Sequence, residues 1–465
     1  MQRKMRVIRA IKVVLMMAVA TVVSAWSADA QTNAINAFSP YSMYGIGELS
    51  TQGALPMRSM GGVGLGWRSS SMANLLNPAG YSATLQKSAI FNFGLEGMSL
   101  QNSQNRYDAA TGVNMGAVKS SKSSFNFHEI ALQLPLAKGL GIGLSLKPNS
   151  SVGYKMTSVE QDENAWAEAG QVKYNYSGEG DITEVKLGVG WEIFRGFSLG
   201  VAGMYYWGDI DRKYTTTIPY NVVGGGELLS AIGNDNFSVS NFKFQAGLQY
   251  SVIDNDKRSL TIGATYDLGG SLNPKVTRDF YINDSYATEV YKDDYRSEIR
   301  LPMQIAGGIF YQDVNWSAGF DYVYQNWQGK NPKIAEIIEQ GLEVAYANTS
   351  TYKVGLEYTP NRFDVRRYFN RISYRVGARY GNYYQTYAGK SLNQYAVTAG
   401  FGLPLRFLGA SSVDVGFEYG GRGTRATIGG GTAPRIGLVR QHYFKFAVGL
   451  SMFGEDYWFV RPKYD

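Results

Sequence analysis

The chain of 465 residues has no cysteine and only two histidines, His128 and His442. Without thiols it cannot form disulfides, a cysteine-linked lipid anchor or a Cys/His metal site. A barrel that hydrolyses lipids with His128 as base stays an alternative, but no serine motif supports it. A weak Ca²⁺ site at the loop acids Asp254 and Asp256 or Asp293 and Asp294 also stays open. We predict a protein that is not an enzyme, with no cofactor and no metal.

Long apolar runs are also missing. Beyond residue 30 no run approaches the ~20 apolar residues that a membrane-spanning helix needs. The formal charge is +7, but residues 1–30 hold five basic side chains against one aspartate, which leaves +3 for the rest. The remaining Lys and Arg form no cluster that could follow a phosphate backbone. We therefore expect no nucleic-acid partner.

The N-terminus has the three parts of an export signal. A basic stretch, residues 1–12, precedes the apolar run Val13–Val23 and then Ala28-Asp29-Ala30. Small residues after a short apolar run are typical of a cleaved signal peptide. We predict a signal peptide at residues 1–30, with Gln31 as the first mature residue.

Most of the chain alternates between apolar and polar residues with period 2. In the stretch from Glu184 to Ile193, one face carries Val185, Leu187, Val189, Trp191 and Ile193, and the other carries Glu184, Lys186, Gly188, Gly190 and Glu192. The pattern recurs to the C-terminus, and its apolar face carries no charge. Lys or Arg on a lipid-facing barrel surface costs about 2–4 kcal/mol at the bilayer midplane, and Tyr and Trp prefer its rims. A soluble β-sandwich, with one apolar face on each sheet, is the alternative.

The connections between these strands alternate in length. Short links lie at 137–139, 194–196, 254–258, 312–315 and 406–410, and long polar links separate them. This alternation is typical of outer-membrane barrels, with short periplasmic turns and long extracellular loops. We predict an all-β fold: an antiparallel transmembrane barrel of about 14 strands over residues 87–465, with both termini periplasmic. Residues 360–370 break the rule as a long basic link on the short-turn side.

Two segments depart from the regular pattern. Between residues 122 and 136 the apolar positions change parity, which predicts a β-bulge and a kinked strand near His128, Glu129 and Pro135. A plain irregularity of the sequence explains the change equally well. In residues 328–348, Ile334, Ile337, Ile338 and Leu342 have helical spacing and predict a short amphipathic helix over the barrel mouth.

Residues 31–86 read differently from the barrel. The stretch from Tyr41 to Tyr81 is rich in Gly, Ser and Met and has neither period. We interpret residues 31–86 as a compact hatch inside the lumen. Its apolar residues are candidates for a hydrophobic path through the lumen, because Met side chains adapt to ligands of varied shape. These residues are Met57, Met60, Leu65, Trp67, Leu75 and Leu76. The alternative is ordinary packing of the plug against the wall.

Asn77-Pro78-Ala79, directly before the first barrel strand, resembles the motif of the FadL-type outer-membrane transporters. The phrases SPYSMYGIGELS, MRSMGGVGLGWRSS, NLLNPAGYSA, GVGWEIFRGFSLGVAGMYYWGDI and GLEYTPNRFDVRRYFNRISYRVGARY are similar to the version found in Bacteroidetes outer-membrane proteins. The resemblance covers the mature chain and implies a fourteen-stranded barrel blocked by an N-terminal hatch. It assigns Asn77, Pro78 and Ala79 a structural role in that hatch.

The same resemblance implies passive uptake of hydrophobic, fatty-acid-like molecules, past the hatch or through a gap at a kinked strand. The broad family also contains a barrel of the type IX secretion machinery, so a structural barrel that binds proteins through its extracellular loops is the alternative. We expect outer-membrane lipids, a hydrophobic ligand and, during insertion, the barrel-assembly machinery as partners of a monomer.

Overall fold

The computed structural model describes residues 39–454, apart from residues 87, 108–110, 160–171, 220–227, 256, 284–286, 298, 329–334, 338–341, 406–410 and 431–432. The predicted signal peptide lies outside these residues. Among the residues described, no helix is both long and apolar enough to cross a membrane.

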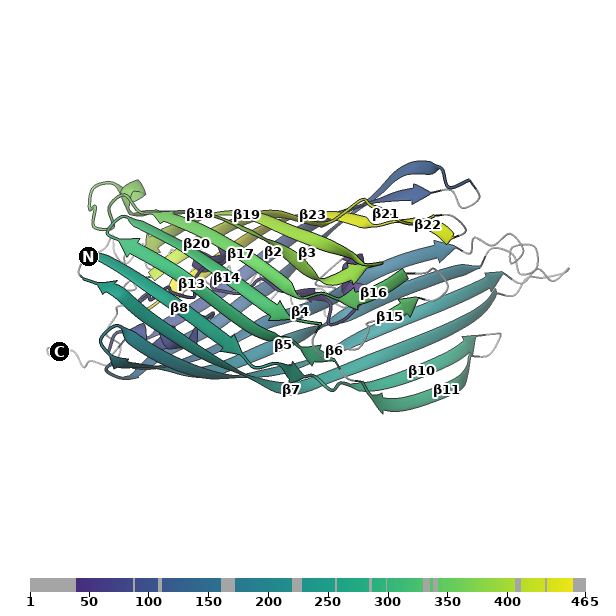
Figure 1. Ribbon diagram of the computed structural model, residues 1–465, viewed down its shortest axis with the longest axis horizontal. Coiled ribbons are helices and arrows are strands. Elements are labelled where there is room, and N and C mark those ends of the chain that lie inside the picture. Colours follow the sequence, from purple (N-terminus) through teal and green to yellow (C-terminus); the bar gives the residue numbers. More distant parts are fainter. Residues whose placement is uncertain are drawn as a thin grey trace, which may run out of the picture. The chain divides into compact units, whose positions relative to one another are not determined.

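Fourteen antiparallel strands form the wall of a closed barrel (Figure 1). They are β2 (Ile90–Tyr107), β3 (Asn114–Ala137), β4 (Leu140–Val159), β5 (Lys173–Phe194), β6 (Phe197–Pro219), β7 (Leu228–Asp254), β8 (Arg258–Asp267), β13 (Met303–Asp313), β14 (Trp316–Asn326), β17 (Thr349–Tyr358), β18 (Ser373–Tyr387), β19 (Lys390–Leu405), β20 (Ser411–Gly423) and β23 (Val439–Met452). Each strand pairs with the next one in this order. The last strand returns to the first, with Phe93 opposite Leu450. The prediction of a fourteen-stranded antiparallel barrel is confirmed.

The period-2 pattern places apolar side chains outside and polar ones inside. On β5, Leu187 and Trp191 face outward and are 51% and 54% exposed, whereas Glu184 and Lys186 between β4 and β6 are buried. Among the fourteen wall strands, closure leaves no strand edge unpaired, which a membrane requires because lipid offers backbone groups no hydrogen bonds. The barrel is therefore of the outer-membrane type.

The two ends of the barrel differ. At one end, here called the turn end, β3 and β4 are joined through residues 138–139, β5 and β6 through 195–196, and β13 and β14 through 314–315. At the other, the loop end, the sheet continues past the wall in the hairpin of β10 (Lys275–Asn283) and β11 (Ala287–Arg296), and β21 (Thr427–Gly430) and β22 (Ala433–Gly437) form a separate two-stranded sheet. The short pairing of β9 (Gly270–Ser271) with β12 (Arg300–Leu301) adds a third small sheet region.

The predicted amphipathic helix in residues 328–348 is wrong. Within that stretch the structure has two strands, β15 (Ala335–Ile337) and β16 (Leu342–Tyr346), which pair antiparallel. β16 also pairs with β18, with Val344 opposite Tyr387. An isolated helix of this length is marginal in water. The extended edge of β18 offers backbone partners that the helical spacing of the isoleucines does not reveal.

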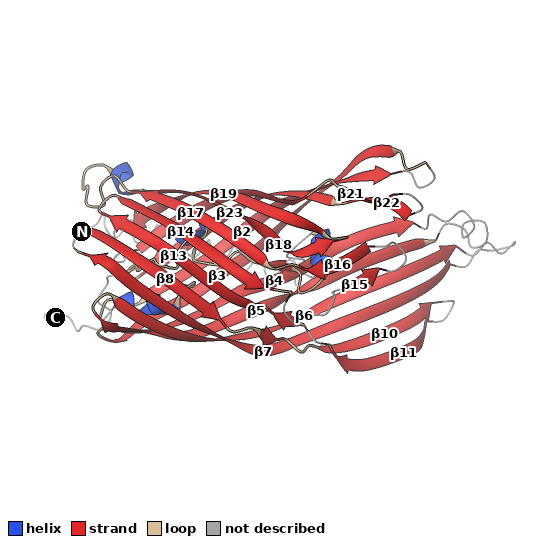
Figure 2. Ribbon diagram, viewed as in Figure 1, coloured by secondary structure: helices blue, strands red, loops and turns tan. Residues whose placement is uncertain are grey.

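Residues 39–88, here called the luminal segment, pack against inward-facing residues of the wall (Figure 2). Their regular elements are short: the 3₁₀ turn η1 (Pro40–Met43), β1 (Glu48–Leu49), α2 (Leu55–Arg58) and the 3₁₀ turn η2 (Pro78–Ala83). Most of the segment is irregular backbone, as its Gly-rich sequence predicts. Of the proposed hatch at 31–86, residues 31–38 lie outside the described part.

Candidate functional site

The luminal segment divides into two layers along the barrel. The layer nearer the turn end, residues 54–84, is here called the turn-side plug, and residues 39–49 are called the loop-side strap. Residues 50–53 join them. Each layer has its own cluster of buried apolar side chains. The lumen is thus filled at two levels.

The core of the turn-side plug is apolar. Its buried members are Ala54, Met57, Met60, Val63, Trp67, Met72, Ala73 and Leu75, with Ile90, Ala131 and Phe310 from the wall. Trp67 stacks on Phe310 with ring centroids 4.8 Å apart. Of the six residues predicted as a hydrophobic path, Met57, Met60, Trp67 and Leu75 belong to this buried cluster, and Leu76 packs against it. Leu65 is buried but is not a member of the cluster.

Asn77, Pro78 and Ala79 attach the plug to wall strands that include β6 and β7. The Asn77 amide donates to the carbonyls of Leu65 (2.9 Å) and of Leu248 on β7 (3.0 Å), and its Oδ1 caps η2 by accepting from Ala79 N (3.1 Å). The motif approaches the wall so closely that a Cβ on Gly200 would overlap the backbone of Pro78 and Ala79. These contacts require both the amide and a glycine-lined wall.

Polar wall side chains also hold the backbone of the plug. Asp321 of β14 accepts from the amides of Gly64 (2.8 Å) and Leu65 (3.1 Å). On another side, Glu129 of β3 accepts from Leu55 N (3.2 Å). Carboxylates that accept from backbone N–H groups make bonds about twice as strong as neutral ones. The plug is therefore fixed to wall strands on different sides of the barrel.

The kink predicted near His128, Glu129 and Pro135 falls where the pairing of β2 with β3 changes register. Gly94 is opposite Glu129 and Leu95 is opposite Phe127, so His128 is an additional residue. As a result, His128 and Glu129 are consecutive but both buried, 6% and 2% exposed. His128 Nε2 lies 3.0 Å from Gly53 O, so both side chains contact the luminal segment.

Pro135 lies closer to the turn, where the pairing of β3 with β4 shifts register between Pro135 and Ala137. The second histidine, His442, lies near the start of β23 and stacks on Tyr419 at a ring-centroid distance of 6.2 Å. Within the described ranges, no group of three or more His, Asp or Glu is arranged to hold a metal ion.

The loop-side strap is held mainly by hydrogen bonds and ion pairs. β1 pairs antiparallel with β4, with Glu48 opposite Ser151. Arg422 Nη2 lies 2.6 Å from Glu48 Oε2. The hydroxyl of Tyr384 donates to Gly47 O at 2.5 Å. Buried aromatic residues surround these contacts: Tyr41, Trp327, Tyr383, Tyr384 and Tyr387.

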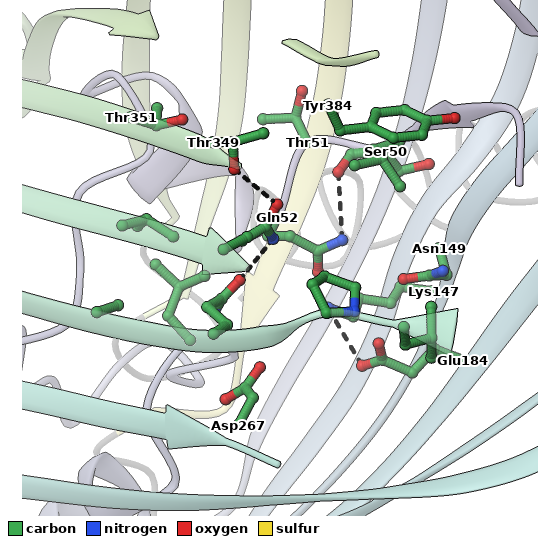
Figure 3. Close-up of a pocket in the computed structure, with 18 of the residues that line it drawn as sticks. Ser50, Thr51, Gln52, Lys147, Asn149, Glu184, Asp267, Thr349, Thr351 and Tyr384 are labelled. Carbon is green, nitrogen blue, oxygen red and sulfur yellow. Dashed lines mark hydrogen bonds and ion pairs between the residues drawn. The ribbon is translucent and has the colours of Figure 1, made fainter. Parts of the chain in front are cut away.

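Between the two layers lies a chamber of about 240 Å³ (Figure 3). Its lining includes seven basic side chains, Lys147, Lys186, Lys243, Lys353, Arg379, Arg422 and Lys445, and three carboxylates, Glu48, Glu184 and Asp267. Some of these charges form ion pairs between neighbouring strands: Lys147 Nζ on β4 lies 3.2 Å from Glu184 Oε1 on β5. Leu65, Leu75 and Leu76 form an apolar floor. The chamber is therefore lined by both charged and apolar side chains.

Sequence reasoning missed the charge pairs inside the barrel. One group outside the chamber joins three strands: Arg375 Nε lies 2.6 Å from Glu357 Oε2, and Arg375 Nη1 lies 2.5 Å from Asp414 Oδ1. In the sequence, the signal is a charge at alternate positions inside otherwise apolar strands. Which charge meets which depends on the register between strands.

Comparisons with known proteins agree on the fold. A Pseudomonas aeruginosa FadL homologue superposes with a TM-score of 0.58 at 13% identity, covering 88% of this chain and 99% of that one. The Pseudomonas putida toluene transporter TodX gives 0.56 at 15% identity, covering 88% and 98%. The monoaromatic hydrocarbon channel CymD gives 0.53 at 12% identity, covering 90% and 100%. At these identities the likeness establishes a FadL-type barrel fold.

No curated protein matches the sequence. The family model described as BamG matches residues 8–465, which is nearly the whole length. Given this match and its FadL-type barrel, the chain belongs to the BamG family.

Proposed function

We propose that this protein is a closed, partner-binding barrel of the outer membrane that works with the barrel-assembly machinery. The family name, BamG, supports the association with that machinery. The observation that carries the closed state is the attachment of the luminal segment to the wall at two levels. This role requires no catalysed reaction, so we propose that the protein is not an enzyme.

The strength of that attachment follows from its contacts. A hydrogen bond to a charged group contributes about 1.5–3 kcal/mol to stability. Asp321 alone accepts two from the plug. Glu129 accepts one more hydrogen bond, which is not counted as charged. Opening a passage requires several of these bonds to break together, together with the apolar contacts of the plug core. This favours a lumen that stays closed during function.

The charged chamber supports the same conclusion. A hydrophobic molecule that enters it displaces water from buried charges, and polar groups left without partners cost about 1–3 kcal/mol each. The chamber walls carry ten charged side chains. These charges disfavour a hydrocarbon in the chamber, although apolar side chains line it as well. We also propose residues 31–86 as the hatch, residues 1–30 as a signal peptide and the turn end as the periplasmic end.

Passive uptake of hydrophobic molecules is the second candidate. The FadL homologue, TodX and CymD have this fold, and the last two are named as a toluene transporter and a monoaromatic hydrocarbon channel. The apolar floor of the chamber supports it. Under this proposal, the ligand passes the plug or leaves near the register shift at His128.

A reversible crosslink separates the two candidates. Ser82 Oγ on the plug and Ser198 Oγ on β6 are 2.9 Å apart, so Ser82→Cys with Ser198→Cys places two sulfurs where a disulfide can form. The chain has no cysteine of its own, so no competing pair arises. We expect the oxidised variant to keep its native complex with the assembly machinery and to leave the levels of other outer-membrane barrels unchanged.

Each single-cysteine variant, oxidised in parallel, is the control. If oxidation of the double variant stops uptake of a lipophilic probe, and a thiol reductant restores it, uptake is the function and the closed-barrel proposal is wrong. If wild-type protein isolated in mild detergent carries no subunit of the assembly machinery, the partner-binding proposal is wrong whatever the probe does.

A further inference from the structure

The connection between β17 and β18, residues 359–372, is unlike the other described connections at the turn end. Those at 138–139, 195–196 and 314–315 are two residues long, whereas this one has fourteen. It contains the 3₁₀ turn η4 (Tyr368–Arg371). In Figure 1 the connection, in green, extends past the ends of the strands. We call it the β17–β18 loop.

The loop is internally braced despite its exposure. Asp364 Oδ1 accepts from the amides of Arg366 and Arg367, both at 2.8 Å, and its Oδ2 accepts from Asn370 Nδ2 at 2.6 Å. Asn361 N donates to Asn370 O at 2.7 Å and closes the base. The Arg367 amide, then Asn370 and the Arg366 amide, hold the pKa of Asp364 below its ordinary value. The loop therefore has one defined shape before it meets any partner.

This shape presents apolar side chains to the surroundings. Phe363 is 85% exposed and Phe369 is 74% exposed, more than any wall aromatic on the lipid-facing surface. Burying a phenylalanine side chain contributes about 1.5–3 kcal/mol. The loop leaves two such side chains unpacked, as the centre of a binding site does. Its internal hydrogen bonds also mean that ordering the loop for binding costs little free energy.

The charge around these side chains is strongly positive. The loop contains Arg362, Arg366, Arg367 and Arg371, and its one acid, Asp364, is occupied by the internal hydrogen bonds. Arg371 stacks over the Tyr368 ring at 4.9 Å. Arg is enriched at protein interfaces, and opposite charge on the partner steers association. A partner surface that complements the loop would therefore be acidic, with apolar side chains at its centre.

We propose that the β17–β18 loop is a docking surface for an acidic segment of a protein partner, whose apolar side chains cover Phe363 and Phe369. The inference deepens the proposed function, because it names the surface through which the closed barrel meets a partner at the turn end. A protein is favoured over lipid because the loop extends past the strands and is shaped in advance. Insertion of the loop into anionic lipid is the competing outcome.

Site-specific photocrosslinking in living cells tests the proposal. A benzophenone amino acid replaces Phe363 or Phe369 in the full chain, and Val314 serves as a matched position because it is 58% exposed in a neighbouring turn at the same end. We expect one protein crosslinked at 363 and 369 but not at 314, with the crosslinked peptide rich in Asp and Glu. Crosslinks to phospholipid alone, or equal yields at all three positions, overturn the proposal.

A charge-reversal pair makes the test specific. Arg366→Glu with Arg367→Glu should lower the crosslink yield at Phe363 about tenfold. Lys257→Glu with Arg258→Glu makes the same change of charge at the β7–β8 turn and should leave the yield unchanged. Heat-modifiable migration on gels checks that every variant is folded. If both pairs lower the yield equally, or neither does, the loop is not the docking surface.

The two proposals fail separately. If the complex with the assembly machinery persists while the loop variants crosslink nothing, the proposed function stands and the docking surface lies elsewhere. If no complex forms but a protein still crosslinks to the loop, the loop binds a partner outside that machinery and the proposed function is wrong.

Discussion

The two layers of the luminal segment are held in place by different physical means. Close packing mainly holds the turn-side plug: apolar side chains fill its core, and its backbone lies directly on glycines of the wall. The loop-side strap also packs in an apolar cluster, and it adds an ion pair to Arg422 and hydrogen bonds from tyrosine hydroxyls. Close-packed interiors respond sharply to added volume, whereas a single hydrogen bond contributes about 0.5–1.5 kcal/mol. The plug should therefore tolerate substitution less well than the strap.

This difference suits a closed barrel with a chamber in the middle. Apolar side chains fill the plug nearer the turn end, and the strap borders the chamber with its charged lining. The comparison can be tested by changing one side chain at a time in each layer.

The largest effect is expected where the plug rests on the wall. Gly200→Ala adds a Cβ that overlaps the backbone of Pro78 and Ala79, so we expect a loss of at least about 3 kcal/mol or failure to fold. The same change at Gly307, where a Cβ meets nothing within 4 Å, should be close to neutral. The temperature at which folded barrel is lost on gels measures both. Equal stability of the two variants would contradict a plug held by shape.

An intermediate effect is expected at the Asn-Pro-Ala motif. Asn77→Ala removes two donated bonds and the cap of η2, which should cost about 2–4 kcal/mol. Asn175→Ala, an exposed asparagine on β5, should change stability by less than about 0.5 kcal/mol. Thermal unfolding in detergent compares them. A cost at Asn77 no larger than at Asn175 would mean that the motif does not anchor the plug.

The smallest effect is expected in the strap. Tyr384→Phe removes the hydroxyl that donates to Gly47 O and accepts from Gln385 Nε2, for an expected cost of about 1–2 kcal/mol. Tyr380→Phe is the matched control on the same strand, because Tyr380 faces outward and is 54% exposed. Should Tyr384→Phe destabilise the barrel more than Gly200→Ala, the contrast between the two layers is reversed.

The barrel wall could be predicted from the sequence because its signal is local. Alternate residues of a strand meet lipid and lumen, so Val185, Leu187 and Trp191 differ in kind from Glu184 and Lys186. The irregular luminal segment could also be predicted, since its many glycines favour neither helix nor strand. The strands at 335–337 and 342–346 could not, because the second of them finds backbone partners on β18, farther along the sequence, that helical spacing does not reveal.

By itself, the sequence determined which side chains face lipid, how many strands close the barrel and which segment is too irregular to join the wall, because alternation and glycine content act over a few residues. The tertiary structure alone decided that Arg375 meets Glu357 and Asp414, that Asn77 reaches a carbonyl of β7, and that a charged chamber separates two layers. These contacts depend on strand register and on the path of the luminal segment, and both are set by the packing of the whole barrel.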